Sequence, residues 1–315
     1  MNLLNENSTY AEVIESPELK RLKDISFLGI LGYCRTRGFN YSTRYEHSLS
    51  VANKCYMYAQ KKNLSRLEER YLVLAGLLHD IGHCNFSHSL EPVFMNRFSI
   101  SHHDVTRHLI LSSSNLVKIW NKYNINSRRI VDTIEGLSTH RDKIVTKMPV
   151  NFDTLDGIAR TESHFSHSNT SWKICKQVFQ VMCNGDRWEN HVSIFDSFWQ
   201  QKERVYSSYI YTHRFRFIEL LFRELFMNEK YLDISHYFLS DSEMQNEFPW
   251  VTQLINDLKS NYSHGFIINQ LNKLKKFGDV VTTSSRRFQI NLNKEFSVFK
   301  NQRYLVSEEI QVSSI

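Results

Sequence analysis

Five side chains that can bind a metal ion or move a proton are concentrated in one short segment, LLHDIGHCNFSHSLE. They are His79, Asp80, His83, His88 and Glu91. If this segment is helical, adjacent His79 and Asp80 point about 100° apart, so both reach one ion only at the edge of a buried face, with His83 one turn further on. Imidazole nitrogen and carboxylate oxygen together suit divalent metals. The segment therefore predicts part of a metal site. His79 and Asp80 alone do not hold an ion, so further ligands must come from elsewhere.

Further ligands are available elsewhere in the chain. His47 lies in the segment RYEHSLSVA, and Asp153 and Asp156 lie in VNFDTLDGIAR. A buried polar side chain on an apolar helix needs a partner. We therefore interpret His47 and the His79–Asp80 pair as metal-ligating groups and not as ordinary core residues. Either aspartate can complete such a site.

The pattern of apolar residues predicts a mainly helical chain that positions these groups. Helical periodicity is found over residues 46–62, 65–83, 214–227 and 252–277. The second of these segments begins with Ser65 and has Glu68 three residues later, which is the signature of a capping box. After residue 278 apolar and polar residues alternate and β-branched residues are enriched, which predicts a few short strands.

The composition agrees with a helical, globular protein. The 315 residues include only 10 Gly and 4 Pro, which favours long helices. Five Cys without a CxxC pair indicate reduced thiols, and we expect a cytoplasmic protein. No secretory signal is visible, and no apolar run reaches the roughly 18 residues of a membrane span. The net charge of +6 is compatible with an ordinary surface or with a polyanionic ligand, and does not decide between them.

Several motifs, in this order, resemble those of the HD-domain metal-dependent phosphohydrolases. They are LKRLKDISFLG (19–29), TRYEHSLSVA (43–52), LAGLLHDIGHCNFSHSLE (74–91), SHHDVT (101–106), DTLDGIAR (153–160) and YIYTHRF (209–215). Within that superfamily the chain is similar to the deoxynucleoside triphosphate triphosphohydrolases. The resemblance covers roughly residues 18–220 and leaves the C-terminal third unmatched.

The resemblance implies a set of metal ligands. They are His47, His79, Asp80 and Asp153. Asp156 would then support a ligand instead of binding the ion. The ion would be divalent, and Mn, Mg, Fe and Zn all suit such a donor set.

The resemblance also implies roles for residues around the ion. The residues that would bind phosphate oxygens, transfer protons or orient those that do are His83, His88, Glu91, His103 and Asp104. Glu91 would orient His88, and Asp104 would orient His103, the second histidine of the HH pair. Candidate substrate contacts are Arg44, Arg204 and Tyr211.

Some positions depart from the family where its members recognise deoxyribose. Phe27 stands in place of a Gln, Gly157 in place of a Tyr and Thr161 in place of an Asp, and Thr154 follows the metal carboxylate where Lys or Arg is usual. A buried hydroxyl that loses its partner costs about 1–3 kcal/mol, which is enough to change substrate preference. The sugar end of the substrate is therefore expected to differ, or other groups have taken over its recognition.

Three functions remain open. The first is a (deoxy)nucleoside triphosphate triphosphohydrolase that releases nucleoside and triphosphate. The second is an HD phosphohydrolase of another phosphoester, namely a nucleoside monophosphate, a signalling nucleotide or a nucleic-acid end. The third is a low-turnover nucleotide- or nucleic-acid-binding regulator, suggested by the basic residues Lys273, Lys275, Lys276, Arg286 and Arg287.

The expected architecture is an HD-domain helical core over residues 15–225. A C-terminal helical extension, residues 226–315, would end in short strands and could serve oligomerisation or contact with a polyanion. The resemblance implies a nucleotide substrate and a homo-oligomer. Nucleic acid is a possible partner, and no membrane is expected.

Overall fold

The computed structural model describes residues 7–34, 41–138, 142–184, 188–259, 281–287 and 306–312, and these are almost entirely helical. The α-helices are α1 (Ser8–Glu15), α2 (Pro17–Lys20), α3 (Arg44–Lys61), α4 (Arg66–Leu78), α5 (Ser87–Phe98), α6 (His102–Ser112), α7 (Ser114–Tyr123), α8 (Ser127–Glu135), α9 (Phe152–Phe165), α10 (Thr170–Asn184), α11 (Val192–Val205), α12 (His213–Met227), α13 (Asp241–Glu247) and α14 (Pro249–Lys259). Short helical turns include η3 (Gly29–Tyr33), η6 (Tyr206–Ile210) and η7 (Ile234–Phe238).

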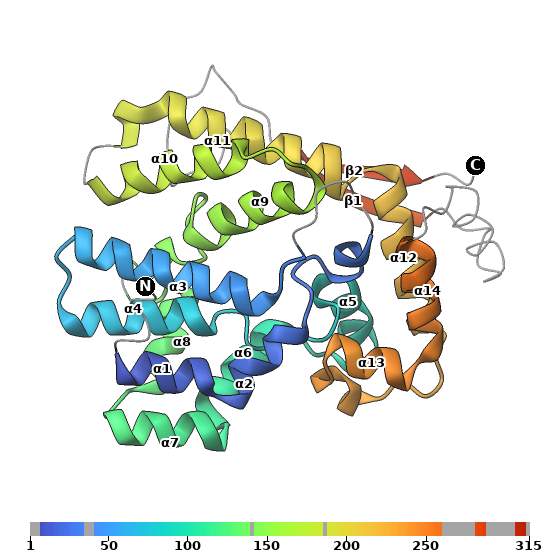
Figure 1. Cartoon of the computed structure of the whole chain (residues 1–315), viewed down its shortest axis with the longest axis horizontal. Coiled ribbons are helices and arrows are strands. Elements are labelled where there is room, and N and C mark those ends of the chain that lie inside the picture. Colours follow the sequence, from blue (N-terminus) through green and yellow to red (C-terminus); the bar gives the residue numbers. More distant parts are fainter. Residues whose placement is uncertain are drawn as a thin grey trace.

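Helices α3 and α4 lie side by side, on the left in Figure 1. The capping box predicted at Ser65 and Glu68 is present, because the Ser65 hydroxyl accepts from the Glu68 backbone and the Glu68 carboxylate accepts from the Ser65 backbone. The two helices touch at Gly76, where an added Cβ would lie 2.8 Å from the Cα of Ala52. This close approach lies near His47 of α3 and the C-terminal end of α4, so it brings the predicted ligands together.

The helix predicted over residues 65–83 ends earlier, at Leu78. His79 is the C-cap of α4, and the HD pair continues into turns closed by hydrogen bonds from Ile81 N to Leu78 O and from His83 N to Asp80 O. A glycine at position 82 permits this path, because a Cβ there would lie 2.3 Å from the backbone oxygen of His102. The expectation that His79 and His83 share one helical face was therefore wrong.

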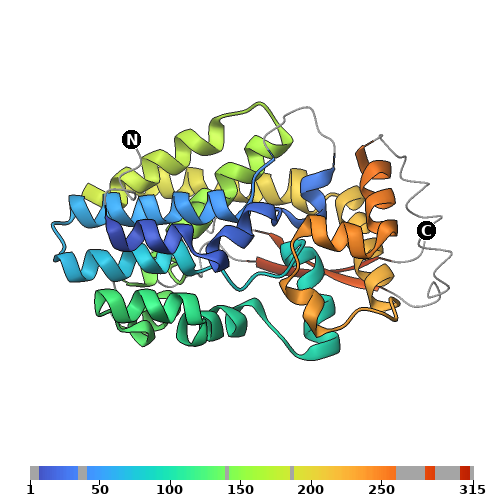
Figure 2. The ribbon, with the colours of Figure 1, turned by 60° about the horizontal axis from the view of Figure 1, so that its bottom comes forward.

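Two apolar clusters build the interior. One contains residues of α1 to α4 and of α7 to α11, and the other contains residues of η3, α5, α12, α13 and α14. Figure 2 shows the corresponding elongated shape, with the α3–α4 end opposite the α12–α14 end. The segment between α4 and α5 crosses from the first cluster to the second, so the HD motif lies at the seam between them.

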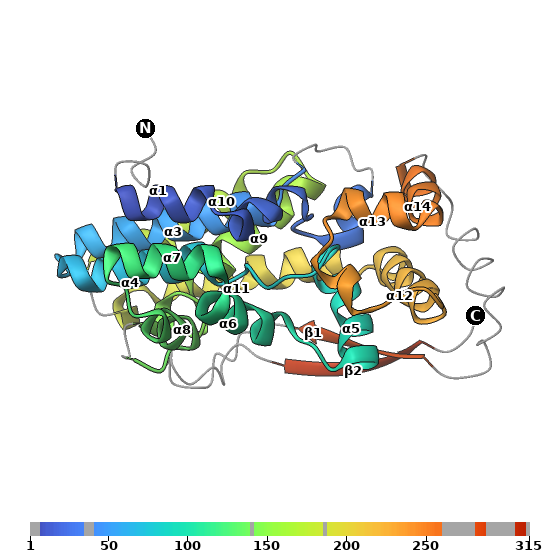
Figure 3. The ribbon, with the colours of Figure 1, turned by 90° about the horizontal axis from the view of Figure 1, so that it is seen from below.

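The C-terminal third is described only in part. The helix predicted over residues 252–277 begins at Pro249 and is described to Lys259, and its remainder lies outside the described residues. Strands β1 (Val281–Arg287) and β2 (Val306–Val312) pair antiparallel (Figure 3). The other strands expected after residue 278 lie outside the described residues. The domain boundary expected near residue 225 stays a prediction. Helices α13 and α14, which follow it, pack in the same apolar cluster as α12, which precedes it.

Two expectations from composition concern the whole chain. All five cysteines are buried thiols. In the part of the chain that the structure describes, none of the helices combines the length and the apolar character needed to cross a membrane.

Candidate metal centre and the adjoining cavity

Three elements that are distant in sequence bring the predicted ligands together. His47 comes from α3, the His79–Asp80 pair from the end of α4, and Asp153 from the first turn of α9. The Nε2 atoms of His47 and His79 are 3.3 Å apart, and Asp153 Oδ1 lies 3.2 Å from His47 Nε2. Both histidines are buried, whereas the Asp153 side chain is 41% exposed. The ligand atoms of these three residues therefore face one point that is open on the side of Asp153.

The hydrogen bonds of the two histidines test whether this point fits a metal ion. The Nδ1 atom of His79 is 2.9 Å from the carbonyl oxygen of Gly76, and since a carbonyl only accepts, Nδ1 carries the proton. The Nδ1 atom of His47 is 2.8 Å from Asp156 Oδ2. Asp156 is ionised, because burial is outweighed by Lys54, His47 and Arg160, which hold its pKa well below its usual range. His47 therefore also donates from Nδ1, which follows from its partners.

In the neutral form of each ring Nε2 is then the unprotonated nitrogen, and the two Nε2 atoms lie 3.3 Å apart. One cation placed between them would bind both nitrogens and the Asp153 carboxylate. The His/Asp donor set is typical of an HD metal site and fits a divalent ion. The second aspartate of the DTLDGIAR motif, Asp156, supports a ligand, since it bonds Nδ1 of His47.

Asp80 is shared between the metal-ligating groups and Arg44. Its Oδ1 lies 3.5 Å from His79 Nε2, and its Oδ2 lies 2.7 Å from Arg44 Nη1. Burial opposes ionisation, but the nearby His79, Arg44 and His83 hold the pKa of Asp80 well below its usual range. Arg44 also donates from Nε to Ser87 Oγ and from Nη2 to Phe27 O. Three of the five N–H groups of this predicted phosphate contact are thus already used within the protein.

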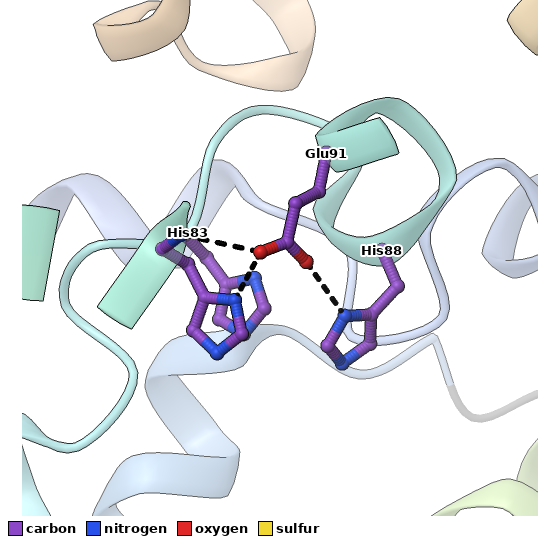
Figure 4. Close-up of side chains that lie close together, drawn as sticks. His83, His88 and Glu91 are labelled. Atoms are coloured by element: carbon purple, nitrogen blue, oxygen red, sulfur yellow. Dashed lines mark hydrogen bonds and ion pairs between the residues drawn. The ribbon is translucent and has the colours of Figure 1, made fainter. Parts of the chain in front are cut away.

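A second cluster lies beside the first and is centred on Glu91 of α5. Its members are His83, His88, Glu91 and His102. One carboxylate oxygen of Glu91 is 3.2 Å from His88 Nδ1 (Figure 4). The other accepts hydrogen bonds from the backbone and Nδ1 of His102. The rings of His83 and His102 stack with centroids 4.1 Å apart. Despite partial burial, hydrogen bonds from His102 and His88 lower the pKa of Glu91, so it is a carboxylate that fixes both imidazoles.

The structure places His102 in this cluster, where the sequence had suggested His103. The His103 side chain is exposed, and Asp104 does not orient it, because its carboxylate accepts from Ser101 Oγ while its backbone N–H donates to the same oxygen. Ser101 is the N-cap of α6. A signal for this was present in the sequence: SHHD reads as a capping box, which assigns Asp104 to the helix end and puts His102 at its first position.

A cavity of about 740 Å³ opens from the metal centre. Its cationic lining residues are Arg44, Lys202, Arg216 and Arg223, and its aromatic ones are Phe27, Tyr206 and Tyr211. Tyr211 is thus placed where substrate contact was predicted. Arg204 is not, because it is exposed on α11 and Lys202, two residues earlier, faces the cavity instead. Sequence reasoning missed Lys202, Arg216 and Arg223, which no motif marks.

The residues that depart from the resembled family share one wall of this cavity. The Phe27 ring lies 4.8 Å from the His47 ring, and a Cβ on Gly157 would lie 3.4 Å from Phe27 Cζ. Thr161 donates from its hydroxyl to the Gly157 carbonyl at 2.7 Å. The aromatic side chain at position 27 therefore packs directly beside the space that Gly157 leaves.

Comparison with known proteins agrees with this geometry. Residues 44–148 match the HD domain family, so the chain carries an HD domain that includes His47, His79 and Asp80. The uncharacterized proteins YdhJ and YwfO of Bacillus subtilis are 37% identical over 102 residues and 31% identical over 157 residues. These matches cover 32% and 47% of this chain but only 28% and 35% of the two relatives, so the chain spans about a third of their length.

Two crystal structures share the fold. A hypothetical protein from Aquifex aeolicus superposes with a TM-score of 0.66 at 18% identity, over 91% of this chain and 84% of that one. A phosphohydrolase from Bacteroides thetaiotaomicron superposes with a TM-score of 0.58 at 17% identity, over 88% and 75%. The likeness extends well beyond residues 44–148, and at these identities it is a likeness of fold.

Proposed function

We propose that the chain is a metal-dependent phosphohydrolase that acts on nucleotides. The observation that carries this proposal is the convergence of two imidazole Nε2 atoms and the Asp153 carboxylate beside a cavity that is lined by several cationic side chains. The HD domain match and the fold shared with a phosphohydrolase support it.

The residues present divide the chemistry of phosphoester cleavage between the two clusters. His47, His79, Asp80 and Asp153 would hold the ion, which when bound neutralises phosphate charge and lowers the pKa of a water molecule. In the cleavage, a water oxygen bonds to phosphorus as the phosphorus–oxygen bond to the leaving group breaks. Glu91 orients His88 and His102, either of which can give a proton to the leaving oxygen or take one from water. Lys202, Arg216 and Arg223, which line the cavity, would bind phosphate oxygens.

More finely, we propose a (deoxy)nucleoside triphosphate triphosphohydrolase that releases nucleoside and intact triphosphate. The order of the motifs from residue 19 to residue 215 supports this. So does the number of cations that line the cavity, since Lys202, Arg216 and Arg223 together suit more than one phosphate group. As in the resembled family, the subunits would form a homo-oligomer.

A second candidate is hydrolysis of another phosphoester, and the wall formed by Phe27 and Gly157 favours it. Thr161, at the position of a sugar-reading acid, already donates its hydroxyl proton to the backbone. This wall offers apolar contact where the family offers hydrogen bonds to a sugar. Nucleoside monophosphates, signalling nucleotides and nucleic-acid ends are the alternatives.

A nucleic-acid-binding regulator is the third candidate, and the basic tail suggested it. Lys273, Lys275 and Lys276 lie outside the described residues, and only the backbone of Arg286 and Arg287 is described. This function would show itself as binding of DNA or RNA that weakens steeply with salt and is lost when Arg286 and Arg287 are replaced.

The proposal is tested with a panel of nucleotides and nucleic acids incubated with Mn²⁺, Mg²⁺ or Co²⁺, with products separated by chromatography. Nucleoside and inorganic triphosphate are expected from a nucleoside triphosphate. Orthophosphate or a nucleotide as product would support the second candidate. His79→Ala is the negative control, and equal turnover by that variant, or no metal-dependent hydrolysis of any phosphoester, would contradict the proposal.

A further inference from the structure

The segment that leads into α5 has a strained backbone next to the cavity. Phe86 and Ser87 have φ values of 51° and 48°, so two consecutive residues other than glycine adopt the left-handed conformation. Such a conformation is unfavourable for residues with a Cβ and persists only where surrounding contacts enforce it. The turn therefore needs partners that hold it.

This turn positions groups on both sides of the site. Ser87 Oγ accepts from Arg44 Nε at 2.8 Å and donates to Ser26 O at 3.0 Å. The next residue, His88, lines the cavity and is bonded to Glu91. A shift of residues 86–87 would therefore move His88 and loosen the support of Arg44 together.

The carboxylate of Asp241 bonds to the turn from outside the HD domain. Its Oδ1 accepts from the backbone N–H of Phe86 at 2.6 Å, and its Oδ2 accepts from the backbone N–H of Ser26 and the hydroxyl of Tyr33, each at 2.9 Å. Asp241 is fully buried at the N-terminal end of α13. It thus joins the turn to the segment that begins at Ser26 and includes Phe27.

Three residues that precede Asp241 in sequence bond to the segment just before the turn. The Tyr237 hydroxyl donates to Gly82 O at 2.7 Å, and Asn85 Nδ2 donates to His236 O at 2.6 Å and Leu239 O at 3.2 Å. We call residues 236–241 the clamp. Every one of these bonds reaches the stretch between the HD pair and α5, more than 150 positions away in sequence.

We propose that Asp241 is a positioning residue for hydrolysis, which holds the left-handed turn at Phe86 and Ser87 so that His88 and Arg44 face the substrate. The clamp would complete the site from a part of the chain outside residues 44–148. The expected effect on hydrolysis rests on the proposed function, whereas the expected effect on the backbone of the turn does not.

The chemistry at Asp241 explains why a carboxylate is required. Burial raises the pKa of Asp241 to about 7, against the three donors that converge on it and favour the ionised form. The ionised carboxylate is the side-chain group of this size that only accepts. Asparagine has the same shape but would turn an NH₂ group toward one or more of these donors. Asp241→Asn therefore removes part of this bonding with little change in volume.

The test measures two properties of purified Asp241→Asn. Amide hydrogen exchange in peptides covering residues 84–90 is expected to rise by about tenfold or more, in line with loss of a buried hydrogen bond. With the nucleotide that the wild type hydrolyses, kcat is expected to fall about 10- to 100-fold while KM changes little, since a displaced His88 affects the reaction more than binding. Mn²⁺ affinity should stay at the wild-type value, because no metal-ligating residue is touched.

Matched controls separate positioning from loss of folding. Glu18→Gln alters a half-buried carboxylate that accepts from Ser113 and Asn115 and does not line the cavity, and it is expected to keep wild-type kcat and exchange. If Asp241→Asn does not fold, Tyr237→Phe removes only the hydroxyl on Gly82 O and should give a smaller change of the same kind.

The two proposals fail in different ways. Wild-type exchange at residues 84–90, or wild-type kcat in a folded Asp241→Asn, would overturn the positioning role. If the wild type hydrolyses no phosphoester, the proposed function fails, and the exchange measurement still decides whether Asp241 holds the turn.

Discussion

The two imidazole clusters lie side by side and share the HD motif, yet they are built differently. In the metal centre each histidine has its own Nδ1 partner, Asp156 for His47 and Gly76 O for His79, and both rings are buried. In the other cluster one carboxylate, Glu91, holds both His88 and His102, and the His88 side chain is 61% exposed. Separate, buried partners fix lone pairs for an ion. A shared partner at an open cavity leaves imidazoles that can exchange protons.

The largest expected effect is that of removing a ligand from the metal centre. His79→Ala should lower turnover by about 10³-fold or more, since the charge stabilisation that a bound ion supplies is worth several kcal/mol. Calorimetric Mn²⁺ titration should show the loss of binding in the same variant. His108→Ala, at an exposed histidine of α6, serves as control and should behave as wild type. Metal binding retained in His79→Ala would mean that the ion is held elsewhere.

The next effect separates the clusters. Glu91→Gln should lower kcat by about 10²-fold, within the range for loss of general acid–base assistance, with unchanged Mn²⁺ affinity. The carboxylate would no longer fix the two imidazoles through Nδ1. Measurements of kcat and of Mn²⁺ affinity on the same variant test whether the two clusters have separate roles. A large loss of both would show that the two clusters form one metal site.

A smaller effect is expected where Asp156 supports His47. Asp156→Asn should weaken Mn²⁺ binding about 10- to 100-fold, as for other groups that orient a ligand, and turnover should recover at high Mn²⁺. The reason is the loss of the charge that keeps His47 protonated at Nδ1. Turnover that stays low at saturating metal would assign Asp156 a role beyond the metal centre.

The smallest effect is expected at the exposed neighbour of the second cluster. His103→Ala should change kcat by no more than about twofold, since exposed side chains without a buried partner contribute little. His102→Ala, one residue earlier, should resemble Glu91→Gln because it removes a partner of that carboxylate. If steady-state kinetics showed a larger loss of kcat for His103→Ala than for His102→Ala, His103 would be the active-site histidine, as the motif had suggested.

The sequence predicted the helical fold and the approach of three of the proposed ligands, because both depend on local signals. Capping boxes, periodicity and the HD dipeptide are readable in the residues themselves, and His47, His79 and Asp153 do meet. The failures are of another kind. The end of α4 at Leu78 depends on close contact with α6 at Gly82, and the choice of Lys202 over Arg204 depends on how α11 is rotated in the packed molecule. Tertiary contacts decide such points, and no local pattern reports them.

The ligands of the metal centre come from α3, the end of α4 and α9, with more than 100 residues between His47 and Asp153. An ion bound there would tie these three helices together, and the unfolded chain has no comparable site. The melting temperature should therefore climb with the concentration of any cation that binds, by an amount set by its dissociation constant. Thermal shift measurements across a series of salts would thus rank candidate ions before any substrate is known.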